Sequence, residues 1–135
     1  MDREEVLVKA KRDFQFLHER VLGTLVFGSW ARCEASDRSD IDLCIVAPSE
    51  KDPASLWIDA ISRIQNSRYE VRIFELLPLY MKMAVIEEGF VVFSRDVLEL
   101  YEYFYPFRRL WEDQKYRQTV SREEMREILG ASMSK

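Results

Sequence analysis

The chain has few of the residues on which several common kinds of active site depend. Its 135 residues include a single histidine, His18, and two cysteines, Cys33 and Cys44. One histidine argues against histidine-based catalysis. The two cysteines form neither a CxxC motif nor a disulfide framework, so a reducing, cytoplasmic environment is expected.

Long apolar runs and an excess of positive charge are also missing. No run approaches the roughly 20 apolar residues that span a bilayer, and the charged stretch 1–13 is not patterned as a secretory signal. The net charge is −4, whereas a general nucleic-acid-binding protein is usually basic. The sequence thus predicts neither a membrane nor a nucleic-acid partner. One bound nucleotide is still compatible, because a metal ion can neutralise its charge.

The remaining composition is that of one globular domain over residues 1–135, with 47% hydrophobic and 33% charged residues. Apolar spacing of three and four residues predicts helices, and short β-rich runs predict strands. The expected helices cover 3–21, 30–34, 53–64, 78–88, 96 to a break at Pro106, and 121–129; the expected strands cover 22–27, 41–46, 69–74 and 91–93. The predicted fold is α+β or α/β, a small mixed sheet of about four strands flanked by helices, with C-terminal helices.

The stretch GSWARCEASDRSDID, residues 28–42, carries most of the functional information. Gly28 and Ser29 end an apolar run, where a strand-to-helix turn offers backbone N–H groups and a hydroxyl to a phosphate. Asp40 and Asp42 begin the next apolar run. Alternate strand positions share a face, so these carboxylates can converge on one divalent cation or bridge two. A metal-binding pair beside a phosphate-binding turn indicates nucleotide chemistry.

A third carboxylate is expected on a neighbouring strand, where it would bind a second metal ion or accept a proton. Glu70 is the best candidate, in the strand YEVRIF. It occupies an alternate position opposite in direction to Val71 and Ile73, where a core would not accommodate a charge. Arg72 shares its face and could bind a phosphate or neutralise the site. Glu75, at the end of the strand, is the fallback.

These residues together resemble the signature of the DNA polymerase β-like nucleotidyltransferase superfamily. The match is to its minimal nucleotidyltransferase branch, which is written GSxARGxxxxxSDIDLxV. The segment VRIFELLPLYMKMAVIEEGFVVFSRD follows the order of the same branch. The resemblance covers about residues 20–95, which would form the nucleotidyltransferase core, and leaves residues 96–135 as a helical extension.

The resemblance implies a role for each matching residue. Gly28 and Ser29 would contact the triphosphate, and Arg32 would pair with a phosphate or brace the loop. Asp40, Asp42 and Glu70 would hold Mg²⁺, in a site that takes two ions. Two positions depart from the pattern: Cys33 replaces a glycine, and Glu70 replaces an aspartate.

The predicted activity is magnesium-dependent transfer of a nucleoside monophosphate, AMP from ATP, to a hydroxyl acceptor. Similar minimal proteins are antitoxins that adenylylate a HEPN-domain toxin, so a protein acceptor of this type is expected. An alternative is a module of the same fold that binds nucleotide or a partner without turnover. Cys33 and Glu70 favour it, and an ion pair between Glu70 and Arg72 would remove the third metal ligand. A third alternative is a structural antitoxin subunit that acts through its C-terminal helices, which could also form a homodimer.

Overall fold

The computed structural model describes residues 1–36, 38–64 and 68–133, with the side chains of 118–121, 128 and 130–133 left aside. The elements follow one another as α1 (Arg3–Asp13), η1 (Gln15–Leu17), β1 (Gly23–Phe27), β2 (Ile41–Val46), α2 (Pro53–Arg63), β3 (Tyr69–Ile73), η2 (Phe74–Leu76), α3 (Leu79–Glu88), β4 (Phe90–Ser94) and α4 (Val97–Met133). None of the described helices combines the length and the apolar character needed to cross a bilayer.

The four strands form one mixed sheet in the order β3-β2-β1-β4. β1 is antiparallel to both β2 and β4, whereas β2 and β3 are parallel and are joined through α2. A parallel pair needs such a crossover, because a tight turn cannot return the chain to the same end of the sheet. The predicted mixed four-stranded sheet with flanking helices is confirmed.

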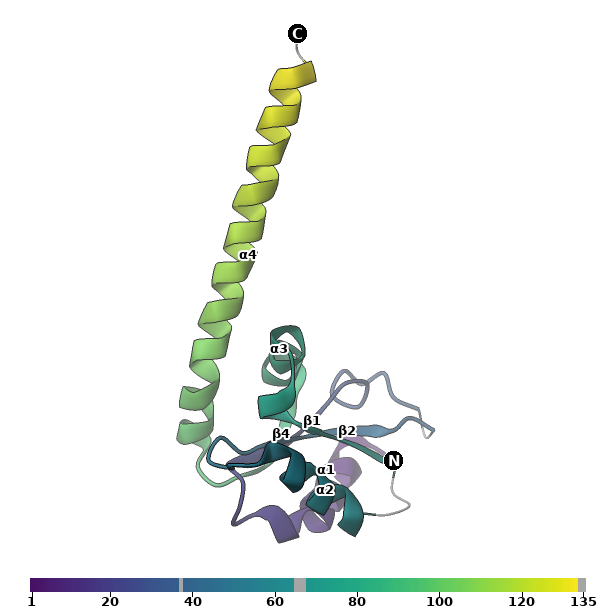
Figure 1. Ribbon diagram of the computed structural model, residues 1–135. Helices are drawn as coiled ribbons and strands as arrows, with labels where there is room; N and C mark the ends of the chain where they lie inside the picture. Colours follow the sequence, from purple (N-terminus) through teal and green to yellow (C-terminus); the bar gives the residue numbers. More distant parts are fainter. Residues whose placement is uncertain (37, 65–67, 134–135) are drawn as a thin grey trace.

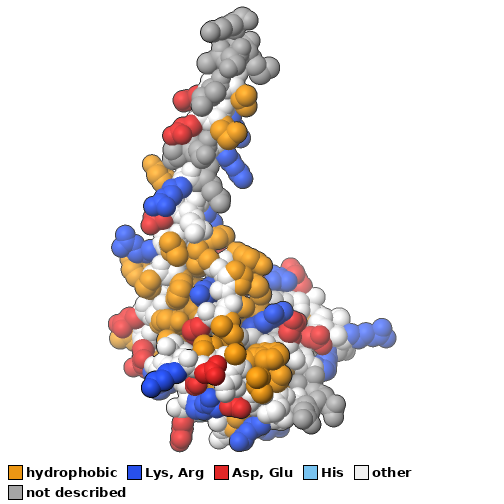
Figure 2. All heavy atoms as spheres, viewed as in Figure 1, with side chains coloured by type: hydrophobic (Ala, Val, Ile, Leu, Met, Phe, Trp, Pro, Cys, Tyr) orange, Lys and Arg blue, Asp and Glu red, His pale blue; other side chains and the backbone are white. Residues whose placement is uncertain are grey.

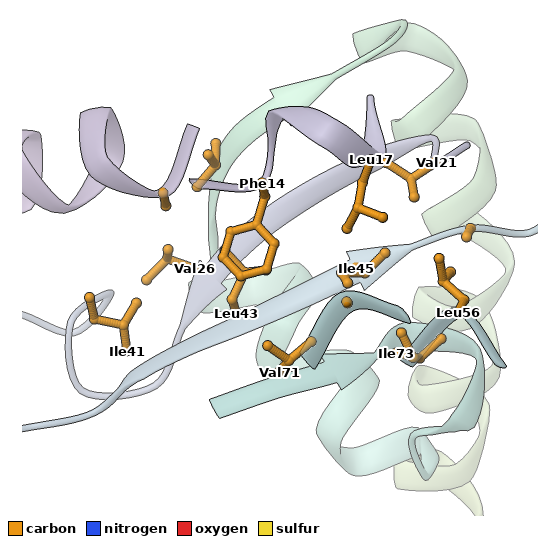
Figure 3. Packing of buried hydrophobic residues seen from close by; sticks show 14 of the residues in the cluster. Phe14, Leu17, Val21, Val26, Ile41, Leu43, Ile45, Leu56, Val71 and Ile73 are labelled. Carbon is orange, nitrogen blue, oxygen red and sulfur yellow. The ribbon is translucent and has the colours of Figure 1, made fainter. Parts of the chain in front are cut away.

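Helices cover both faces of the sheet (Figure 1). α1 and α2 lie on one face and enclose the first core cluster, which includes Phe14, Leu43, Ile45, Val71 and Ile73 (Figure 3). α3 and α4 lie on the other face and enclose a second cluster around Leu25, Cys44, Phe74, Leu100 and Phe104. Alternation along β2 therefore sends Leu43 and Ile45 to one side and Cys44 to the other.

The predicted start of α2 is confirmed, but the predicted first helix is too long. The side chain of Asp52 accepts a hydrogen bond from the N–H of Ser55, and Pro53 occupies the first turn. α1 ends at Asp13, and the chain continues in the 3-10 turn η1. The apolar spacing that runs on to Val21 misleads here, because a 3-10 turn also returns to the same side about every three residues.

The expected short helix over 30–34 is also wrong, because these residues form turns. Two backbone hydrogen bonds close this loop. The N–H of Arg32 donates to the carbonyl of Gly28 at 3.1 Å, and the N–H of Glu34 donates to that of Ser29 at 2.9 Å.

The C-terminal region is one helix rather than two, because α4 continues through Pro106. Proline removes the hydrogen bond to the residue four positions earlier, here Glu102. Both residues lie on the exposed side of α4, where water can hydrate the freed carbonyl. Leu100 and Phe104 hold the helix to the sheet through the buried second cluster. Figure 1 shows the rest of α4 projecting from the globular part.

Glu75 joins α4 to the end of β2 and is not part of the carboxylate site. One carboxylate oxygen accepts from the N–H of Ala47 at 3.0 Å, and the other accepts from the hydroxyl of Tyr103 at 2.8 Å. The position considered as a fallback for the third acid therefore has a structural partner on each side.

Replacing Tyr103 by phenylalanine is expected to destabilise the fold by about 1–2 kcal/mol, because one oxygen of the partly buried Glu75 loses its donor. Urea unfolding followed by circular dichroism measures this change. Tyr105→Phe is the matched control on the exposed side of α4. Equal unfolding midpoints for the two variants would contradict the assigned role of the bond.

Candidate functional site

Two of the predicted acids lie side by side across neighbouring strands. In the register of the sheet Asp42 pairs with Phe27 on one side and with Glu70 on the other. Directly paired residues point to the same face, which here is the face covered elsewhere by α3 and α4. Asp42 is half-buried and Glu70 is exposed. This part of the face is therefore open to solvent at the β3 edge.

Gly28 follows β1 directly and lies against the carboxylate of Asp42. Its φ of +72° lies in the left-handed region that favours glycine. A Cβ atom at Gly28 would collide with a carboxylate oxygen of Asp42. The turn expected to bind phosphate thus lies directly beside the acid expected to bind metal.

The loop between Gly28 and Asp40 is anchored by residues that the sequence analysis did not single out. Trp30 is 6% exposed and packs in the first core cluster. Its indole N–H donates to the carbonyl of Ser39 at 3.4 Å, and Arg68 donates to the same carbonyl at 2.7 Å. The chain just before Asp40 is therefore held from two sides. The large apolar side chain directly after Gly28 and Ser29 is the feature of the sequence that could have predicted the anchoring role of Trp30.

Arg32 is paired with two carboxylates in this structure. Its guanidinium donates to Glu34 at 3.0 Å and to Glu88, at the end of α3, at 3.2 Å. These contacts join the loop to the end of α3, and the two roles that the resemblance implies for Arg32, pairing with a phosphate and bracing the loop, stay predictions.

The environment of Asp42 disfavours its charged form. Burial, the neighbouring negative charge of Glu70 and a hydrogen bond with that carboxyl raise the pKa of Asp42 to about 6. Asp40 adds to the increase, whereas the positive charge of Arg72 opposes it. Glu70, Arg72 and Asp40 therefore all act electrostatically on Asp42, although Asp40 itself is exposed.

Glu70 already has a partner, because Nη2 of Arg72 donates to its Oε1 at 2.5 Å. Among the described residues, no three acidic, cysteine or histidine side chains are arranged around a common metal position. The donor set nevertheless suits Mg²⁺, which prefers carboxylate oxygens. Burial first, and then the negative charge of Glu70, raise the pKa of Asp42, and a divalent cation would favour its charged form. For Glu70 to bind the cation together with Asp40 and Asp42, its hydrogen bond with Arg72 would have to break.

Cys33 has a backbone conformation that favours glycine. Its φ of +59° lies in the left-handed region, and its side chain is exposed. The loop thus places a side chain where glycine would be unstrained, at a cost of about 1 kcal/mol.

Substitutions at Cys33 are expected to change stability in opposite directions. Cys33→Gly should stabilise the protein by about 0.5 kcal/mol, because the strain is relieved at some cost in chain entropy. Cys33→Val should destabilise it by about 1–2 kcal/mol, because a branched Cβ tolerates the left-handed region poorly. Chemical denaturation of the three proteins measures both effects. Two changes of the same sign would contradict the assigned strain.

Comparison with known proteins places this site in a family. Residues 12–98 match the family described as Polymerase beta, Nucleotidyltransferase. A protein of Methanocaldococcus jannaschii assigned as a protein adenylyltransferase is 41% identical over 98 residues, which cover 73% of this chain and 75% of the relative. The chain therefore belongs to the polymerase β nucleotidyltransferase family. The predictions of membership in the polymerase β-like superfamily and of a nucleotidyltransferase-class enzyme are thereby confirmed.

Solved structures share the fold. A crystal structure of a toxin–antitoxin with AMP-PNP matches with a TM-score of 0.68 at 15% identity, over 88% of this chain and 98% of that chain. A structure of the tri-AMPylated Shewanella oneidensis HEPN toxin in complex with MNT antitoxin matches with a TM-score of 0.61 at 16% identity, over 91% and 98%. A protein from Sulfolobus solfataricus assigned as a nucleotidyltransferase matches with a TM-score of 0.51 at 19% identity, over 69% and 84%.

Proposed function

We propose that this protein transfers AMP from ATP to a hydroxyl group of a protein acceptor. One observation carries the proposal: Gly28 lies against the carboxylate of Asp42, and Asp42 is in register with Glu70. A turn suited to phosphate therefore adjoins two acids suited to a cation. Both are needed to bind a nucleoside triphosphate for transfer from its α-phosphorus.

Each residue has a distinct proposed role. Asp40, Asp42 and Glu70 would hold Mg²⁺, which when bound neutralises phosphate charge and aligns the attacking and leaving oxygens. Gly28 and Ser29 would bind the triphosphate through backbone N–H groups and the serine hydroxyl. Glu70 lies on an edge strand and its side chain is 49% exposed, so an acceptor hydroxyl can approach it from solvent.

The proposed acceptor is a HEPN-type toxin, for which this chain would be the antitoxin, in the cytoplasm. The assignment of the M. jannaschii relative as a protein adenylyltransferase and the AMPylated toxin beside an MNT antitoxin support a protein acceptor. Leu98, Tyr101 and Tyr105, in the first turns of α4, are more than half exposed. Hydrophobic side chains also gather where α4 leaves the globular part (Figure 2). This surface suits a protein partner. A second copy of this chain, in a homodimer through α4, would compete with the toxin for the same surface.

A second candidate is a module that binds nucleotide or a partner without turnover. The ion pair between Glu70 and Arg72 favours it, because it occupies the third proposed ligand. The two candidates share the same fold, and they differ in whether AMP is transferred to the acceptor.

Incubation of the protein with α-labelled ATP, Mg²⁺ and the product of the neighbouring gene tests the proposal. Label on the acceptor that depends on Mg²⁺ and disappears in Asp42→Ala is the expected result. ATP binding without label on that partner would support the module instead. The partner must be the true one, because an arbitrary protein offers no acceptor.

A further inference from the structure

Arg72 lies next to the proposed acids, and the proposed transfer assigns it no role in binding the cation or the triphosphate. It lies two residues after Glu70 on β3, so both side chains point to the same face. Its guanidinium is hydrogen-bonded to Glu70, and the two side chains are 46% and 49% exposed. An ion pair this exposed contributes little to folding. The contribution of this ion pair to the stability of the fold therefore does not explain why an arginine occupies position 72.

Arg72 is also the cation that acts on the neighbouring acid. Among the described residues, it is the only positive side chain whose charge lowers the pKa of Asp42 against burial and Glu70. Two other arginines near the site have different partners: Arg32 is held by Glu34 and Glu88 on the loop side, and Arg68 donates to the carbonyl of Ser39. Arg72 thus supplies positive charge beside the carboxylates.

We propose that Arg72 exchanges partners, holding Glu70 in the nucleotide-free protein and donating to phosphate oxygens of the triphosphate in the loaded protein. The inference rests on the proposed function. Oε1 of Glu70 accepts from Arg72 in this structure, and the same oxygen cannot serve Arg72 and a cation equally well. The freed guanidinium has a planar fork of donors that matches two phosphate oxygens.

The exchange predicts effects of opposite sign in one variant. Arg72→Gln releases Glu70, so binding of Mn²⁺ in the absence of nucleotide should strengthen by about threefold, as the nearby positive charge is removed. The same variant loses a charge-assisted donor to phosphate. Binding of ATP in EDTA should therefore weaken by about tenfold. Isothermal titration calorimetry measures both affinities without relying on transfer activity.

The chain offers a matched control at the other end of the sheet. Arg95 donates to Glu99 at 2.7 Å, and these side chains are 47% and 48% exposed, nearly the same as in the Arg72 pair. Arg95 follows β4, whose last residue Ser94 pairs with Gly23, at the opposite end of β1 from Phe27 and Asp42. Arg95→Gln should leave both affinities unchanged. Arg72→Lys keeps the charge but loses the fork, so its ATP affinity should fall between those of the wild type and Arg72→Gln.

The outcomes separate this inference from the function on which it rests. Tighter Mn²⁺ binding together with weaker ATP binding in Arg72→Gln supports the exchange. Wild-type affinities in Arg72→Gln, beside a wild-type protein that binds ATP, overturn the exchange and leave the proposed function standing. Weakening of both affinities also overturns it, because Arg72 would then only help to shape the site. A wild-type protein that binds neither ATP nor Mn²⁺ overturns the proposed function and the inference together.

Discussion

Replacing Asp42 by asparagine is expected to abolish nucleotidyl transfer and to make the folded protein more stable at pH 7–8. Transfer should fall by at least about 100-fold, because a charged group that organises the transition state is removed. Stability should rise by about 1 kcal/mol, or about 3–5 °C in Tm, after allowing for the solvent exposure of this carboxylate. Burial and the neighbouring Glu70 disfavour the charged form of Asp42, and asparagine has no charge to bury.

The gain has a defined pH dependence. The pKa of Asp42 in the folded protein is raised from 3.8 to about 6. Between these two values the folded state binds more protons than the unfolded state, so the wild type loses stability as the pH rises from about 4 to about 6. The advantage of Asp42→Asn should therefore be largest above pH 6 and vanish near pH 4. Thermal unfolding of both proteins across this range measures it.

Asp40→Asn is the control for this prediction. Asp40 is exposed, so its replacement should impair transfer but change stability by no more than about 0.5 kcal/mol. Equal stabilisation by both substitutions would show that removal of any negative charge from the acidic chain is responsible. A destabilised Asp42→Asn would contradict the cost assigned to burying this charge beside Glu70.

Gly28→Ala should give the second large effect, a loss of about 2–3 kcal/mol in stability together with loss of ATP binding. About 1 kcal/mol comes from the left-handed φ. The rest comes from the added Cβ, which would push the Asp42 carboxylate out of place. Urea unfolding and calorimetric titration with ATP measure the two losses. Ser29→Ala is the control, with weaker ATP binding but nearly unchanged stability.

A double-mutant cycle tests the collision itself. In Gly28→Ala combined with Asp42→Ala the added methyl group has no carboxylate to displace. Only the cost of the backbone conformation should remain, so the two substitutions should couple by about 1–2 kcal/mol. Strict additivity would show that the cost of alanine at Gly28 is entirely a matter of φ.

Local signals in the sequence were enough for the sheet and for one pair of acids. Strand β2 begins and ends where its apolar run does, and alternation placed Glu70 and Arg72 opposite Val71 and Ile73. The alignment of Asp42 with Glu70 depends on the register between two strands separated by a helix. Local spacing does not encode this register, which the packing of both faces of the sheet fixes.

Contacts between distant residues could not be predicted in the same way. The pairing of Arg32 with Glu88 depends on where α3 ends relative to the loop, 56 positions away. The continuation of α4 through Pro106 depends on tertiary packing on both sides of the proline, by Phe104 before it and by Phe107 and Trp111 after it, which outweighs the local preference of proline. The turn at Cys33 takes a conformation that its residue type disfavours, so composition gave no indication of it.

Strand β3 lies at an edge of the sheet, where another chain could add a strand. The N–H of Ile41 donates to the carbonyl of Arg68, so the backbone groups of Val71 point away from β2. The indole of Trp57 donates to the carbonyl of Val71 at 2.9 Å. This side chain of α2 thus blocks the middle of the edge against self-association into extended sheets, while Glu70 on the adjoining face stays open to an acceptor.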